Sequence, residues 1–127
     1  MTIKHLMTCL FVLVFSFINV CNSYGEEREI NMQYNGTPND HYNFPVPADQ
    51  PDVYYDTVNQ QIIIDGGGEV TYYDVEIASV STWTVVISTQ VSGYYDTIDV
   101  SSLPTGEYCI TIDSPTGNSF EGFFDTY

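Results

Sequence analysis

The chain has 127 residues, of which 17 are acidic and two are lysine or arginine, so its formal net charge is −15 at pH 7. A charge of this sign repels phosphate backbones and anionic lipid surfaces, which excludes nucleic acid as a partner and disfavours anionic membranes. Hydrophobic residues make up 43% of the chain, enough to build the core of one small domain.

The first 25 residues predict a signal peptide. Lys4 gives a short cationic start, and the apolar run 6–20 follows it. That run is too short to span a membrane as a stable helix, and it has the length of a secretory hydrophobic region. Ser23 and Gly25 supply the small residues that a signal peptidase requires. We therefore expect residues 1–25 to be removed and the rest, without a transmembrane helix, to be periplasmic, at the cell surface or secreted.

Lipidation is the alternative to simple cleavage. Cys21 would carry a lipid anchor if it became the first residue of the mature chain, although Val20 precedes it where such sites usually have a small residue. Cleavage after Gly25 would instead remove Cys9 and Cys21 and leave Cys109 alone, so that no internal disulfide could form. Whether Cys21 is lipidated or removed, and whether Cys109 stays free, is open at this point.

Residues 26–51 predict a short strand followed by a long loop. Ile30, Met32 and Tyr34 alternate weakly with polar residues. Four of the six prolines lie between positions 35 and 51, and proline is poorly tolerated inside helices and central strands.

Residues 52–127 predict the main body of the domain. Apolar and polar residues alternate in short runs between turn residues, and no ten-residue segment has helical periodicity. The predicted fold class is all-β: an antiparallel two-sheet sandwich of immunoglobulin or fibronectin III type with about seven to eight short strands. The expected strands of the main body cover residues 53–56, 60–65, 70–77, 83–91, 94–100, 107–113 and 119–126.

Side-chain alternation within these strands predicts which residues form the core. The consecutive isoleucines 62–64 indicate a strand that is covered on both faces. Trp83 and Tyr94 are expected to point the same way as the apolar residues of their strands. Tyr108 is expected to face the core, and Cys109 therefore to face the opposite side of its strand.

The stretch 98–112, with the sequence IDVSSLPTGEYCITI, resembles the small exported domains of unknown function of family 3244, found mainly in gut Bacteroidetes. Segments 28–30 and 60–64 recur in the same order, and the resemblance covers most of residues 28–127. Its most specific part is the leucine-proline-x-glycine-x-tyrosine turn at 103–108, which shapes a turn and then enters a core strand. The resemblance implies an immunoglobulin-like fold and export, and it brings no assigned activity or catalytic residues.

The C-terminal sorting domains of the type IX secretion route are similar in one respect. They also carry a leucine-proline-x-glycine turn before a core strand. The tail 120–127 lacks the basic residue with which such tails usually end. A secretion-sorting module is therefore kept as an alternative.

The tripeptide Tyr-Tyr-Asp occurs three times and supplies the candidate binding residues. Adjacent tyrosines of a strand face opposite ways, so each pair offers one ring to solvent. Exposed rings beside carboxylates predict a glycan-binding platform, because a ring stacks on a sugar face while a carboxylate accepts hydroxyl hydrogen bonds. The competing interpretation is structural, since tyrosine favours strands and acidic residues keep an exposed face soluble. The candidates are Tyr54, Tyr72, Tyr95 and Asp74.

Neither catalysis nor a cofactor is predicted. Cleavage would leave His41 as the one histidine and no lysine, so acid, base and nucleophile would have to come from carboxylates, Cys109 or hydroxyls. A glycosidase needs two carboxylates across a cleft, which a small sandwich seldom builds. The loop 65–69 carries carboxylates at both ends but lacks the ligand spacing of an EF-hand, so we predict a strand connection and no metal site.

Together these expectations predict an exported, non-catalytic module of unknown activity that binds a protein or a glycan in the envelope. The alternatives are an accessory domain of carbohydrate processing and a sorting module. The identity of the ligand and the oligomeric state stay open, because one fold supports many functions.

Overall fold

The computed structural model of the chain describes residues 26–35 and 46–126. The expected signal segment 1–25, with Cys21, and His41 lie outside the described residues, so the expectations about them stay predictions. No helix long and apolar enough to cross a membrane occurs in the described ranges.

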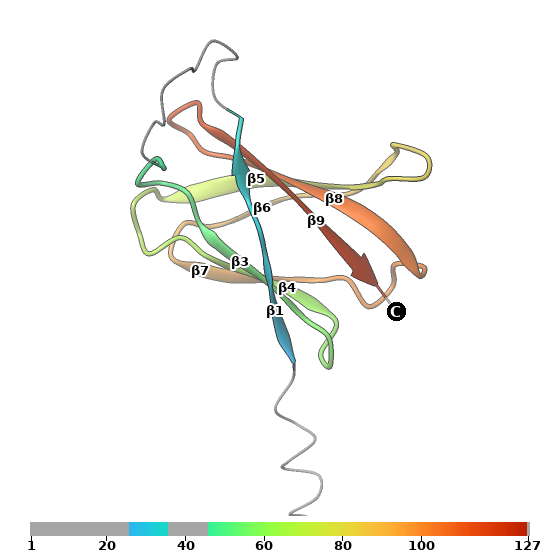
Figure 1. The fold of residues 1–127 in the computed structure, drawn as a ribbon. Helices are drawn as coiled ribbons and strands as arrows, with labels where there is room; N and C mark the ends of the chain where they lie inside the picture. Colours follow the sequence, from blue (N-terminus) through green and yellow to red (C-terminus); the bar gives the residue numbers. More distant parts are fainter. Residues whose placement is uncertain (1–25, 36–45, 127) are drawn as a thin grey trace, which may run out of the picture.

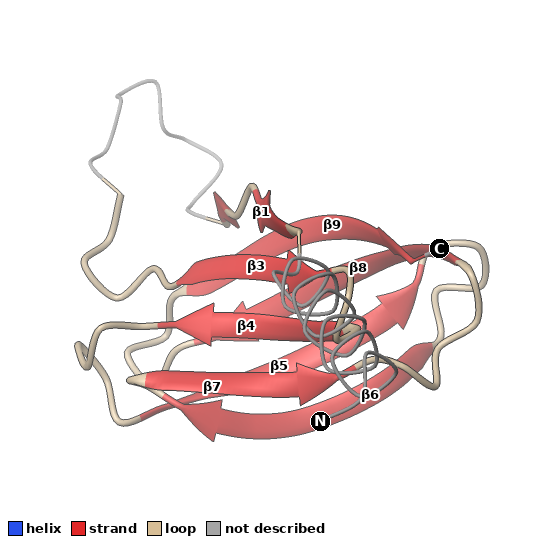
Figure 2. Ribbon diagram, turned by 90° about the horizontal axis from the view of Figure 1, so that it is seen from below, coloured by secondary structure: helices blue, strands red, loops and turns tan. Residues whose placement is uncertain are grey.

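Two antiparallel sheets pack face to face, which confirms the predicted all-β sandwich (Figures 1 and 2). The small sheet has the strand order β1-β3-β4-β7, and the large sheet has the order β2-β9-β8-β5-β6. We expected seven to eight strands, and the described residues form nine. The strands are β1 (Glu27–Ile30), β2 (Gln33–Tyr34), β3 (Asp52–Asp56), β4 (Gln61–Asp65), β5 (Tyr72–Ser79), β6 (Val85–Ser92), β7 (Tyr95–Asp99), β8 (Gly106–Asp113) and β9 (Ser119–Thr126).

The first expected strand is divided because the chain crosses from one sheet to the other. Ile30 of β1 pairs with Val53 of β3 in the small sheet, whereas β2 pairs with β9 in the large sheet. Met32, between the two strands, is buried against Gly122 of β9, where an added Cβ would lie 2.6 Å from the Met32 sulfur. Glycine at this position therefore lets the crossing segment close one side of the sandwich.

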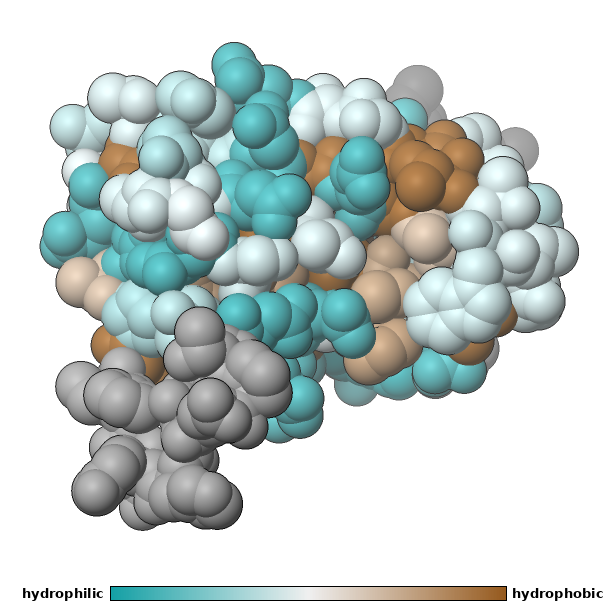
Figure 3. Space-filling model, turned by 90° about the horizontal axis from the view of Figure 1, so that it is seen from above, coloured by the Kyte–Doolittle hydropathy of each residue, from teal (hydrophilic) through white to brown (hydrophobic). Residues whose placement is uncertain are grey.

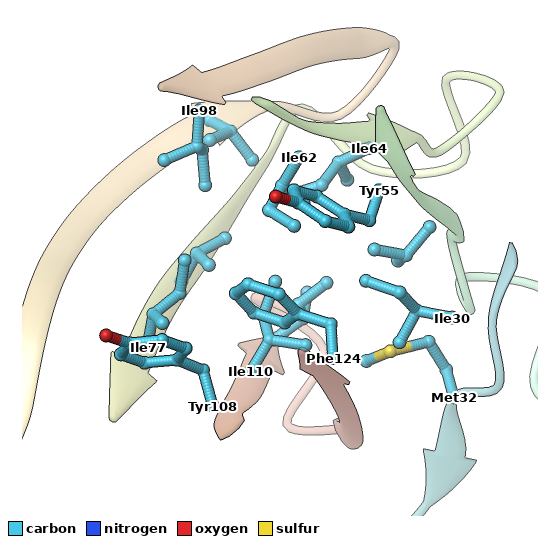
Figure 4. Close-up of a cluster of buried hydrophobic side chains, with 14 of the residues drawn as sticks. Ile30, Met32, Tyr55, Ile62, Ile64, Ile77, Ile98, Tyr108, Ile110 and Phe124 are labelled. Carbon is cyan, nitrogen blue, oxygen red and sulfur yellow. The ribbon is translucent and has the colours of Figure 1, made fainter. Parts of the chain in front are cut away.

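The core lies between the two sheets (Figure 4). The ring of Tyr55 from the small sheet lies 5.5 Å from that of Phe124 in the large sheet, and the ring of Tyr108 lies 5.6 Å from Phe124. Burying a side chain of this size contributes about 1.5–3 kcal/mol. Cys109 is the one free cysteine in the described part of the chain, so packing and hydrogen bonds hold this part together.

The alternation pattern predicts the central strands correctly and fails beside the turns. The isoleucines 62–64 are buried as expected, including Ile63 on the outer face of the small sheet. The expectation for Trp83 and Tyr94 is wrong, since their side chains are 65% and 68% exposed. Both residues lie in the turns that flank β6, where a two-residue period no longer applies. Val85 is also exposed, next to a register shift between β5 and β6.

The turn at 103–108 has a clear structural role. The Tyr108 hydroxyl donates a 2.6 Å hydrogen bond to the Pro104 carbonyl, and the Thr126 hydroxyl donates to the same oxygen at 2.9 Å. This is the arrangement that immunoglobulin domains use as a tyrosine corner. It fixes the entry into β8 against the end of β9.

Candidate functional site

The outer face of the small sheet carries a tyrosine among carboxylates. Tyr54 of β3 lies between Glu29 of β1 and Ile63 of β4 in the strand register. Every second residue of each strand shares this face. We call this surface the Tyr54 face, and it consists of Glu27, Glu29, Asp52, Tyr54, Ile63, Asp65, Tyr95, Thr97 and Asp99.

The carboxylates act directly on the Tyr54 phenol. The negative charge of Asp52 is the largest cause that raises its pKa above the ordinary value of 10.0, followed by burial and the charges of Glu29 and Asp65. Neighbouring negative charges raise a phenol pKa because they disfavour the phenolate. The hydroxyl therefore stays protonated at neutral pH and can both donate and accept a hydrogen bond.

The two tyrosines of this face differ in exposure. Tyr54 is partly buried in the sheet, whereas Tyr95 of β7 is 58% exposed. Two strand spacings separate β3 from β7, which corresponds to roughly 10 Å. The face thus offers two separate rings on one rigid sheet, with the carboxylates of Asp52 and Asp65 in the row that leads to Tyr95.

The four predicted binding residues do not form one surface. Tyr54 and Tyr95 lie on the Tyr54 face, while Tyr72 and Asp74 lie in β5 on the outer face of the large sheet. There the Asp74 carboxylate accepts a 3.3 Å hydrogen bond from the Gln90 side-chain amide. The two pairs are therefore on opposite outer faces of the sandwich.

The outer face of the large sheet is polar except at one end. Figure 3 shows teal and white side chains over most of this face and brown and tan side chains gathered at one end of it. The register places Ala78, Val85 and Phe123 in one row there, with Cys109 between Ala78 and Phe123. Phe123 is 49% exposed. This apolar end is a second surface on which a partner could pack.

The Cys109 thiol is buried within that row. Its expected orientation, away from the core, is confirmed because it pairs with Ala78 and Phe123 on the outer face. Burial raises the pKa of the thiol, and the charge of Glu121 adds to the effect. A buried thiol with a raised pKa is a poor nucleophile, since the reactive form is the thiolate.

The backbone amides of the glycine loop between β4 and β5 form hydrogen bonds within the protein. The amides of Gly66 and Gly67 donate to the Tyr94 carbonyl at 3.0 and 3.2 Å, and the Gly68 amide donates to the Gly93 carbonyl at 3.1 Å. The loop is thus bonded to the turn between β6 and β7. Nowhere in the described ranges do three histidine, cysteine or acidic residues gather closely enough to hold a metal ion.

A buried aspartate that the sequence did not single out joins two loops. The Asp49 carboxylate accepts hydrogen bonds from the Thr116 hydroxyl at 2.6 Å and from the Asn118 amide at 2.9 Å, and its carbonyl accepts one from the Tyr73 hydroxyl at 2.7 Å. Burial alone would raise the pKa of Asp49, but the hydrogen bonds from Ser114, Thr116 and Asn118 outweigh burial and lower it. Burial, followed by the charge of Asp49, raises the pKa of Tyr73 to about 12.

Comparison with known proteins bears on the fold. No family model and no curated protein matches the sequence. Among solved structures, the chain is similar to a DUF3244 family protein from Bacteroides vulgatus ATCC 8482 that is described as having an immunoglobulin-like β-sandwich fold. The TM-score is 0.62 at 15% identity, and the match covers 80% of this chain and 100% of that chain. The fold is an immunoglobulin-like β-sandwich.

The solved protein comes from the family that the stretch 98–112 resembles. At this level of identity the similarity shows the immunoglobulin-like fold alone. Such a fold supports many functions, so the activity has to be argued from the surfaces of this chain.

Proposed function

We propose that this chain is an exported, non-catalytic immunoglobulin-like module that binds a glycan through the Tyr54 face. The observation that carries the proposal is the Tyr54 ring, set in a central position of a sheet with carboxylates around it. Aromatic rings stack on the apolar faces of sugars, and carboxylates accept hydrogen bonds from sugar hydroxyls. A strand residue is also held rigidly, which reduces the entropy lost on binding.

The second ring of the face favours an oligosaccharide over a single sugar. Tyr95 lies two strands away from Tyr54, and Asp65 pairs directly with Tyr95 across β4 and β7. A ligand that contacts both rings must extend across β4. The absence of Lys and Arg from this face also argues against an acidic glycan, because its five carboxylates would repel it.

A glycan array tests this proposal. The wild-type protein is expected to bind a set of neutral glycans, and Tyr54→Ala and Tyr95→Ala are each expected to weaken binding about tenfold or more, since stacking contacts are worth roughly 1–3 kcal/mol. Tyr72→Ala is the matched control, because it removes the same side chain from the opposite face. Absence of binding to every neutral glycan, or an equal loss in the Tyr72→Ala variant, would overturn the proposal.

A protein partner is the second candidate, and the apolar end of the large sheet favours it. Phe123 and Val85 are about half exposed there, and exposed apolar surface of this kind often marks a protein contact. If a partner packs on this end, Phe123→Ser should reduce its co-purification from the native envelope, whereas Tyr54→Ala should not.

Export is part of the proposal and has its own test. The support is the cationic start, the apolar run 6–20 and the small residues before Glu26. Mass spectrometry of the mature protein is expected to find Glu26 as the first residue. An acylated Cys21 at the N-terminus would instead show a membrane-tethered lipoprotein.

A further inference from the structure

The strand β6 is an edge strand with an unusual composition. It has β5 as its one neighbour among the described strands. No charged residue occurs from Ala78 to Tyr95, in a chain with 17 acidic residues. Proteins usually protect edge strands with charges, prolines or bulges, because free edges pair with other chains. Here the one irregularity is the register shift at the start of β6, and the rest of the strand is regular.

The hydrogen-bond pattern shows which backbone groups face the open edge. The Gly93 amide donates to the Thr71 carbonyl at 2.9 Å. In an antiparallel pair such hydrogen-bonded positions alternate with positions whose groups point away. With the observed register, the amides and carbonyls of Ser88, Gln90 and Ser92 point away from β5. Ser88 and Gln90 therefore present a short row of donors and acceptors at the edge.

One carboxylate protects neighbouring parts of the β6 and β7 edges. The two oxygens of Asp96 accept hydrogen bonds from the Ser92 amide at 2.9 Å and from the Thr97 amide at 2.8 Å. Ser92 ends β6 and Thr97 lies in β7, the edge strand of the small sheet. Asp96 thus occupies a donor on each edge and leaves the segment around Ser88 and Gln90 open.

Exposed aromatic rings stand at both ends of β6. Trp83 precedes the strand and Tyr94 follows it, and both rings are about two-thirds exposed. Trp83 also has a φ of 54°, a left-handed conformation that is unusual for a bulky residue. Unfavourable backbone conformations persist where the rest of the structure enforces them, and they concentrate at functional positions.

We propose that β6 is the interface of a homodimer, in which a second copy of this chain adds its own β6 antiparallel about a twofold axis. Placing Ser88 opposite Gln90 of the second copy pairs the open donors and acceptors of both edges and puts Thr89 on the axis. The same pairing brings Trp83 of one copy beside Tyr94 of the other at each end. This surface is distinct from the Tyr54 face, so the inference goes beyond the proposed glycan binding.

Charge explains why a second copy fits this strand. Two chains of net charge −15 repel one another at most contacts. Residues 78–95 carry no charged side chain, so two copies that pair along β6 bring no like charges of this stretch together. The twofold pairing satisfies the open hydrogen-bonding groups of both edges, because each copy supplies the same donors, acceptors and aromatic rings as its partner.

Cross-linking tests the register. In the proposed pair the two Thr89 positions face each other as a non-hydrogen-bonded pair, with Cα atoms about 4.5 Å apart, within the range of a disulfide. In Thr89→Cys, oxidised glutathione should take two electrons and two protons from the two thiols, leaving a covalent dimer and reduced glutathione. Thr97→Cys is the matched control, since Thr97 is also an exposed threonine of an edge strand. No covalent dimer, or an equal yield from Thr97→Cys, would overturn the register.

Sedimentation of the protein, expressed as the full chain and purified after export, tests the dimer itself. The measurement is made at about 100 μM, a concentration at which a dimer with a dissociation constant of about 1 μM is almost fully formed. The wild type and Thr97→Lys should then sediment as dimers. Thr89→Lys should sediment as a monomer with an unchanged circular dichroism spectrum, because two lysines would meet on the axis. A monomeric wild type would overturn the proposal and leave the edge to a strand of another protein. A dimeric Thr89→Lys would place the dimer contact elsewhere.

Discussion

Asp49 links the loop before β3 to the turn between β8 and β9. It is buried, and its hydrogen bonds reach residues 67 and 69 positions away in the sequence. Asp49→Ala leaves the partners Thr116 and Asn118 without their acceptor, so we expect a loss of about 2–3 kcal/mol in the free energy of unfolding at pH 7. Urea denaturation measures this loss.

The pH dependence of Asp49 has a definite sign. Its pKa in the folded protein is lowered from the ordinary 3.8, so the stability it contributes is present above the unfolded pKa and is lost as pH falls through the folded pKa. The stability difference between the wild type and Asp49→Ala should therefore shrink below about pH 4. A difference that stays constant down to about pH 2 would contradict the role of the carboxylate.

Tyr108 tests the tyrosine corner. Tyr108→Phe removes the hydroxyl that donates to the Pro104 carbonyl and keeps the buried ring, so we expect it to cost about 1–1.5 kcal/mol. Tyr34→Phe is the control, because the exposed Tyr34 hydroxyl donates to Asn118 at 3.1 Å and its loss should be nearly neutral. Equal effects of the two substitutions in urea denaturation would show that the corner adds nothing.

Single residues differ in how well a sequence predicts them. Tyr108 and Cys109 could be assigned to opposite sides of β8, because alternation within a regular strand fixes the side. Asp49 could not be recognised, since its partners come together only when the fold forms. Trp83 and Tyr94 depart from the predicted alternation because they lie in the turns beside β6, where a period of two residues does not apply.

At the scale of elements, the glycine loop between β4 and β5 contains a position, Gly66, that has no room for a side chain. A Cβ at Gly66 would lie 2.6 Å from the Tyr73 ring and overlap the Gly93 carbonyl, so Gly66→Ala should cost about 2 kcal/mol or more. Gly117→Ala is the comparison: it has a φ of +95° but open space around it, and about 1 kcal/mol is expected. Thermal unfolding that ranks the two in the reverse order would contradict this account.

The strands themselves were largely predictable, because period-two alternation between turn residues is a local signal. Their ends were less so. The expected strand 70–77 begins at Tyr72, and the expected strand 83–91 begins at Val85. The break of the first strand into β1 and β2 was not predictable, since it depends on which sheet each half joins.

For the whole molecule, the sequence could predict the fold class but not the arrangement of its surfaces. Alternation shows that Tyr54, Tyr72 and Tyr95 are on the outward side of their strands, yet it does not say which sheet each strand joins. The pairing of β5 with β6 and β8 places Tyr72 and Asp74 in the large sheet. The Tyr54 face therefore contains half of the predicted candidates, together with acidic residues of β1 and β4.

We propose that a glycan binds to the Tyr54 face. The most direct measurement is an NMR titration of the isotope-labelled protein with an array-selected neutral oligosaccharide. Binding at the Tyr54 face should change the chemical shifts of Tyr54, Asp65 and Tyr95 and leave those of Tyr72 unchanged. Changes confined to β5 and β8, or no changes at ligand saturation, would contradict it.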